Sequence, residues 1–167
     1  MPETNMIDVG LDTIILHDGD DRQYIYLSEM GGQRRFPIVI GHNEAGEIYR
    51  VVHSSDTPRP LTHQLTYNLL NALGAKLMHV DIVALQHNTF FAQISLENAD
   101  GNSVSTVDAR PSDAIALALR AGCRIRVDEA VLEQARKDVS PPELPPPSEP
   151  DEGTGSDDAG PPSEDLP

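Results

Sequence analysis

The chain has 167 residues and a formal net charge of −15 at pH 7, and 4% of its residues are aromatic. Its length suits a single domain with its own hydrophobic core, and no apolar run approaches the roughly 20 residues that a membrane-spanning helix needs. The single cysteine, Cys123, excludes an internal disulfide, and the N-terminal residues lack a basic or apolar leader, so we expect a cytoplasmic protein that contacts no membrane.

The first third of the chain predicts strands and then a helix. Apolar residues alternate in part over 7–16, and strand patterns return over 24–27 and 36–40. The intervening segment 17–21 contains an Asp-Gly pair, which favours a turn. Apolar residues at helical spacing then predict a helix over about 44–53.

A proline-rich corner, Pro58 to Pro60, ends that helix and precedes another. Thr62 is the expected N-cap of the second helix, and Gly74 is its expected C-terminal end. Three leucines inside it repeat every four residues: Leu65, Leu69 and Leu73. That spacing is typical of a helix.

Beyond Gly74 the apolar period changes to two, which predicts strands over about 78–84 and 90–96 and a third over about 103–108. These strands form an antiparallel meander. A helix over Pro111–Ala121 follows, and its apolar residues on nearly every side indicate burial all round. A strand over 124–127 and a last helix, capped by Asp128 and reaching about Lys137, complete the pattern.

This order of elements predicts an α+β fold, with a single compact domain over 1–137 that holds an antiparallel or mixed sheet and about four helices. Residues 138–167 contain nine acidic residues, no Lys or Arg, and many Pro, Gly and Ser residues, so we predict a disordered acidic tail. The tail carries −9 of the net charge and leaves −6 on residues 1–137. That charge disfavours nucleic-acid binding, although a local basic patch is compatible with it.

Polar side chains gather where the meander ends and the next helix begins, at Asp108, Arg110, Ser112 and Asp113. Two interpretations stay open. Pro111 fits the first helical turn, with Ser112 and Asp113 as capping residues. Alternatively, the helix N-terminus and these side chains form an anion-binding corner.

The polar residues near the Pro58–Pro60 segment also have both a structural and a functional interpretation. His63 either caps its own helix or acts on a substrate. Arg59 is either a phosphate clamp or an ion-pair partner of Asp113. Asp108 ends a strand, where a carboxylate also bonds readily to the backbone of the next turn.

Long strings of this chain resemble the bifunctional nuclease family, whose members share them in the same order. The strings are Phe36–Gly41 with Glu44–Ala45, then Pro58–Ala75, then Asp108–Arg120, and the resemblance extends from about Met6 to Lys137. It implies DNase and RNase activity, and it implies a homodimer or a larger homo-oligomer. We therefore expect a non-specific nuclease that acts on DNA and RNA.

Phosphodiester hydrolysis needs an activated water and neutralisation of charge on the phosphate. In the predicted site, Asp108 and Asp113 hold Mg²⁺ or Mn²⁺ and His63 moves protons; a metal-free route through His63 is also open. The predicted substrate-binding residues are Arg59, Arg110 and Ser112. The alternative is a non-catalytic, oligomeric binding or regulatory module that recognises a small anion or a protein partner, which the charge of −6 favours.

Overall fold

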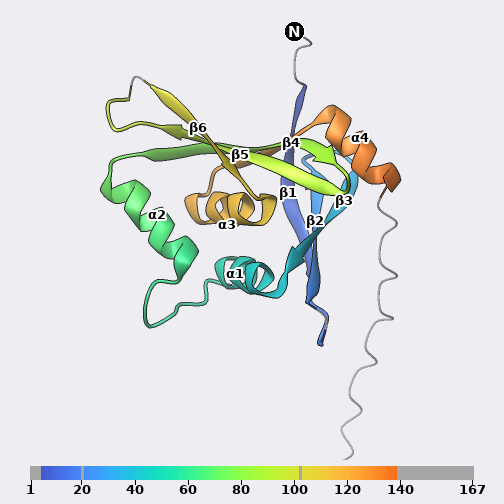
Figure 1. The fold of residues 1–167 in the computed structure, drawn as a ribbon, viewed down its shortest axis with the longest axis horizontal. Coiled ribbons are helices and arrows are strands. Elements are labelled where there is room, and N and C mark those ends of the chain that lie inside the picture. The colour runs from blue at the N-terminus through green and yellow to red at the C-terminus, as the bar shows by residue number, and fades with distance from the viewer. Residues whose placement is uncertain (1–4, 20, 102, 139–167) are drawn as a thin grey trace, which may run out of the picture.

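The computed structural model describes residues 5–19, 21–101 and 103–138, and this part of the chain forms one seven-stranded sheet and four helices (Figure 1). The strands are β1 (Met6–Ile15), β2 (Arg22–Glu29), β3 (Arg35–Gly41), β4 (Lys76–Gln86), β5 (Thr89–Glu97), β6 (Val104–Ala109) and β7 (Arg124–Asp128). The helices are α1 (His42–Val52), α2 (Thr62–Ala72), α3 (Pro111–Ala121) and α4 (Glu129–Asp138). Residues 139–167 of the predicted acidic tail lie outside the described residues.

The sheet has the strand order β3-β2-β1-β7-β4-β5-β6. All neighbours run antiparallel except β4 and β7, which are parallel and pair Val80 with Ile125. On its other edge β7 pairs antiparallel with β1, where Val9 faces Ile125. This short strand therefore joins an N-terminal antiparallel half to the β4–β6 meander, and the predicted α+β class with a mixed sheet is confirmed.

Local backbone signals set several element boundaries. His87 and Asn88 have φ values of 49° and 60°, as a two-residue hairpin turn requires, and they join β4 to β5. Gly122 has a φ of 63° and ends α3 in the left-handed conformation that glycine adopts without strain. Asp128 accepts a hydrogen bond of 2.8 Å from the backbone N–H of Ala130, so its predicted capping role at α4 is confirmed.

Helix α3 lies at the centre of the fold and contacts α1, α2 and the sheet (Figure 1). Residues Ala114 to Ala118 are all buried, as the apolar run predicts. Three of the five are alanines, whose small side chains allow neighbouring elements to approach closely. The N-terminus of α3 is therefore held in a fixed position relative to α1, α2 and the sheet.

Helix α2 differs from the other helices because none of its residues is buried. Four leucines within the helix and at its two caps form an exposed stripe, which we call the α2 stripe. Their exposed fractions are 41% for Leu61, 50% for Leu65, 54% for Leu69 and 73% for Leu73. The leucine period predicts the helix correctly, but this apolar face stays open to solvent. No helix among the described residues has the length and apolar character to span a bilayer.

Candidate active site at the start of α3

The N-terminal turns of α2 and α3 bring together two predicted site residues. His63 is the second residue of α2 and Asp113 is the third residue of α3. The His63 Nε2 atom lies 2.8 Å from Oδ1 of Asp113, and both side chains are partly buried. A histidine and a carboxylate that are 50 positions apart in sequence thus form a hydrogen-bonded pair.

Arg110 links this pair to α1. Its Nε donates to Oδ2 of Asp113 at 2.8 Å, and its Nη2 donates to Oδ1 at 3.1 Å. Nη2 also lies 2.8 Å from Oε1 of Glu44, in the first turn of α1. The side chain is nevertheless 66% exposed, and its Nη1 has no partner among the described residues. Arg110 therefore retains a donor for a ligand while two carboxylates fix its position.

Electrostatics set the protonation of the pair. Burial raises the pKa of Asp113, but hydrogen bonds from Arg110 and His63 lower it, and the resulting pKa lies below the ordinary carboxyl value. The pKa of Arg110 is raised by its bonds to Asp113 and Glu44, so this group stays cationic. Because an ionised carboxylate only accepts hydrogen bonds, Nε2 of His63 carries a proton in this pair, and the matching neutral tautomer has its free lone pair on Nδ1.

The capping interpretation of the corner is wrong. Arg110 occupies the N-cap position of α3 without a side-chain capping bond, and Pro111 is the first helical residue, as predicted. The Asp113 carboxylate binds His63 and Arg110 instead, because both donors lie within reach of the first helical turn. The N-cap of α2 is likewise Leu61 and not the predicted Thr62, which is the first helical residue.

Two predicted site residues lie apart from this network. The expected ion pair between Arg59 and Asp113 is wrong, because Arg110, three residues before Asp113, binds that carboxylate. Arg59 is exposed in the segment before α2, and its side chain makes no polar contact with the described residues. Asp108 is exposed on β6 and likewise contacts no polar group in the described part of the chain, so its expected bond to the next turn is absent there.

The contacts of the Asp113 carboxylate oxygens disfavour the predicted metal site. Both oxygens of Asp113 accept hydrogen bonds, and the adjacent guanidinium of Arg110 repels a cation. Across residues 5–19, 21–101 and 103–138, no three His, Cys, Asp or Glu side chains are grouped to hold a metal ion. As arranged, both oxygens of the Asp113 carboxylate are occupied by hydrogen bonds from His63 and Arg110, and metal binding by Asp108 and Asp113 stays a prediction.

A second network, which the sequence did not reveal, supports the first. Glu47 on α1 is 1% exposed, and its carboxylate accepts from Nε of Arg120 on α3 and from Nη2 of Arg50, each at 3.0 Å. Arg120 also donates to Gln64, next to His63 on α2. This cluster joins α1, α2 and α3 through Glu47, Arg120 and Gln64. Glu44 and Glu47 lie three residues apart on one face of α1, and each binds an arginine of α3 or of its N-cap. This spacing is the local sequence feature that indicates that the two glutamates face the same neighbour.

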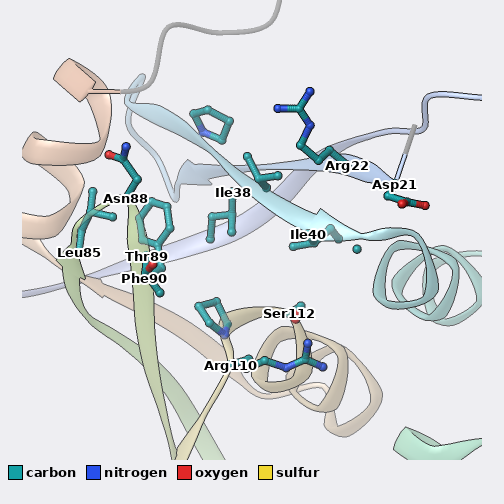
Figure 2. A pocket seen from close by; sticks show the side chains of 14 residues that line it. Asp21, Arg22, Ile38, Ile40, Leu85, Asn88, Thr89, Phe90, Arg110 and Ser112 are labelled. Atoms are coloured by element: carbon teal, nitrogen blue, oxygen red, sulfur yellow. The ribbon is translucent and has the colours of Figure 1, made fainter. Parts of the chain in front are cut away.

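Two hollows are lined by residues of this network. The first, which we call the β3 pocket, has a volume of about 590 Å³ and lies between β3, the β4–β5 turn and the start of α3, with Arg110 and Ser112 in its wall (Figure 2). The second, which we call the α1–α2 groove, has a volume of about 580 Å³, and Glu44 and His63 line it. A ligand in the β3 pocket can therefore reach Arg110, and a ligand in the α1–α2 groove can reach His63.

Comparison with known proteins agrees with the resemblance of the motif strings. The bifunctional nuclease domain matches residues 25–140, which include α1, α2, α3 and every residue of the network. Uncharacterized proteins from two strains of Mycobacterium tuberculosis are 45% identical over 111 residues. That match covers 66% of this chain and 65% of each relative, so the chain spans just under two thirds of their length. The chain belongs to the bifunctional nuclease domain family.

Proposed function

We propose that this protein is a non-specific nuclease that hydrolyses phosphodiester bonds of DNA and RNA, with His63 as its proton-transferring residue. The hydrogen bond of 2.8 Å between His63 and Asp113 carries the proposal. It orients an imidazole at the edge of the α1–α2 groove, next to an arginine with an uncommitted donor. Membership of the bifunctional nuclease domain family supports the same reaction class.

The geometry supports a general acid–base route. Nδ1 of His63 takes a proton from a water molecule as the water oxygen bonds to phosphorus, and Asp113 stabilises the imidazolium that forms. The bond between phosphorus and the leaving ester oxygen breaks, and His63 returns the proton to that oxygen. Arg110 neutralises charge on the non-bridging oxygens through Nη1, and Arg59 supplies a further phosphate contact from the segment before α2.

Metal assistance is part of this proposal. Asp108 and Asp113 are the residues that would hold Mg²⁺ or Mn²⁺, which would supply charge neutralisation at the phosphate. Because Asp113 already binds His63 and Arg110, this role requires those contacts to rearrange. The metal-free route through His63 requires no such change.

Cleavage assays separate the two routes. The full chain, free of contaminating nuclease, is incubated with single-stranded DNA or RNA, with Mg²⁺, Mn²⁺ or EDTA. His63→Gln should lower the cleavage rate by about 100- to 10,000-fold, the usual contribution of a positioned general base. His79→Gln is the matched control, because His79 also lies beside an Asp–Arg pair, with its Nε2 3.4 Å from Asp81. Loss of cleavage in EDTA would establish metal dependence, whereas persistence would favour the metal-free route.

A second candidate function is a non-catalytic, oligomeric module that binds a small anion or a protein partner. It is favoured because cationic side chains around the site are paired with carboxylates, Arg110 with Glu44 and Asp113, and Arg120 with Glu47. Such pairing reduces the positive potential that nucleic acids require. If well-folded protein cleaves neither DNA nor RNA with any of these metals, the nuclease proposal fails and this reading replaces it.

We also propose that the protein forms a homodimer or a larger homo-oligomer in the cytoplasm. The α2 stripe supports the assembly, because four leucines on one exposed helical face form an apolar surface that a partner helix can cover.

A further inference from the structure

Ser112 is an unusual feature of the β3 pocket. It is the second residue of α3, it is 7% exposed, and its hydroxyl makes no hydrogen bond to any group in the described part of the chain. It nevertheless lines the pocket, and Figure 2 shows its side chain on the side of α3 that faces Ile40 of β3. The hydroxyl of a buried residue in the wall of a pocket has an unused donor and acceptor there, which a bound ligand would satisfy.

Further hydrogen-bond donors lie in the wall of the β3 pocket. The first N–H groups of a helix have no intrahelical partner, and because proline has none to give, the N–H of Ser112 is the first free one at the start of α3. Arg110 lines the same pocket, and its Nη1 has no partner among the described residues. A hydroxyl, an amide and a guanidinium at the positive end of a helix form a donor set that suits a phosphate group.

The rest of the pocket wall is largely apolar. Its apolar side chains come from β3, β4, β5 and the start of α3: Pro37, Ile38, Val39, Ile40, Leu85, Phe90 and Pro111 (Figure 2). The Phe90 ring packs against Phe36 with their centroids 5.8 Å apart, so the core supports this wall. The volume of about 590 Å³ falls within the range of small-molecule sites. The pocket thus joins an anion-binding end to an apolar wall with one aromatic ring.

We propose that the β3 pocket binds one nucleotide, with its phosphate at Ser112 and the α3 N-terminus and its base against Ile38 and Phe90. The choice of a nucleotide over another apolar phosphate ester rests on the proposed function, because Arg110 belongs both to this pocket and to the His63–Asp113 network. The occupant is a free mononucleotide or the terminal nucleotide of a strand. Both sources present the same phosphate, sugar and base.

Titration calorimetry of the full chain in EDTA tests this proposal with AMP, adenosine and inorganic phosphate as separate probes. AMP should bind at least about tenfold more tightly than either adenosine or phosphate, because only AMP reaches both ends of the pocket. Ser112→Ala should weaken AMP binding by about tenfold, the usual effect of losing one hydrogen bond to a charged group. This change removes no hydrogen bond among the described residues, so the variant should fold normally.

The chain offers a matched control. Ser95 on β5 is also 7% exposed but lines none of the hollows described here, so Ser95→Ala should leave AMP binding unchanged. Phe90→Leu should weaken AMP binding and leave phosphate binding unchanged. Equal affinities for AMP and phosphate, or an unchanged AMP affinity in Ser112→Ala, would overturn the proposal.

A 5′-phosphorylated tetranucleotide separates the two sources. Ser112-dependent binding of this oligonucleotide identifies a strand end as the occupant, whereas Ser112-dependent binding of AMP alone identifies a free mononucleotide. The AMP-binding proposal and the nuclease proposal can also be refuted independently of each other. Protein that binds AMP through Ser112 but cleaves nothing refutes only the nuclease, and protein that cleaves but does not bind AMP refutes only the pocket assignment. The His63→Gln variant should retain AMP binding in either case.

Discussion

Replacing Asp113 with asparagine should separate a catalytic role from a structural one. The substitution keeps the shape of the side chain but removes the charge that accepts from His63 and Arg110. An asparagine amide can donate to Nε2 of His63, which forces the ring proton onto Nδ1 and removes the base. If His63 acts as proposed, the cleavage rate should fall by about 100- to 10,000-fold, or about 3–5 kcal/mol of transition-state stabilisation.

The stability cost of the same change should be small. Side-chain exposure is 29% for Asp113 and 66% for Arg110, so water already screens their ion pair. Exposed pairs contribute about 0–1 kcal/mol, and the bond to partly buried His63 adds about 1 kcal/mol. Asp113→Asn should therefore lower the free energy of unfolding by about 1–2 kcal/mol, which corresponds to a fall in Tm of about 3–10 °C. Calorimetry and urea unfolding measure this effect on the preparation used for the cleavage assay.

Asp81→Asn is the matched control for this experiment. Asp81 on β4 accepts from Nε and Nη2 of Arg126 at 2.7 and 2.8 Å, and it lies 3.4 Å from His79, so it repeats the same chemistry outside the candidate site. Its side chain is only 16% exposed, and its loss should cost at least as much stability while cleavage persists. The reasoning is refuted if folded Asp113→Asn cleaves within about threefold of the wild type, or if Asp81→Asn loses activity equally.

Three further predictions concern stability and assembly. Glu47→Gln should lower the free energy of unfolding by about 3–5 kcal/mol in urea titrations, because the substitution leaves the Arg120 guanidinium without its buried carboxylate partner. A loss below about 1 kcal/mol would contradict this prediction. The free energy of unfolding should decline as the pH falls below about 4. The pKa values of Asp113 and Glu47 are lowered in the folded state, so the unfolded chain takes up protons first. An unchanged urea midpoint between pH 6 and pH 3 would show that these two carboxylates do not contribute to stability in this way. The wild-type chain should scatter light as a dimer or larger species, and the double variant Leu65→Glu, Leu69→Glu should be a folded monomer whose Tm, unlike that of the wild type, does not depend on protein concentration. A wild-type mass of 18.2 kDa would disprove self-association through the α2 stripe.

Local backbone chemistry explains which elements the sequence predicts well. The bounds of α3 follow from Pro111, whose ring suits the first helical position, and from Gly122, which adopts a positive φ. The β4–β5 hairpin follows from alternation on both sides of His87 and Asn88. The leucine period of α2 predicts a helix but not its exposure, because that depends on which neighbour covers the face.

The contacts within the site depend on packing, which a single sequence does not display. Arg59 and Arg110 are equally plausible partners of Asp113 by residue type, and only the orientation of α3 relative to α1 and α2 selects Arg110. The same orientation brings His63 to Asp113 across 50 positions. The buried position of Glu47 was not predicted, because a charged residue on a helix usually faces solvent.

The place of β7 in the sheet has a consequence for synthesis of the chain. A nascent chain that ends at Gly122 contains both antiparallel halves, β1–β3 and β4–β6, but lacks the strand that joins them. Until Arg124–Asp128 leave the ribosome, β1 and β4 each have an unpaired edge that can recruit strands from other chains. A chain whose translation stops between Gly122 and Arg124 therefore contains every residue of the candidate site but has two unpaired strand edges. Such edges make it a target for chaperones and proteases.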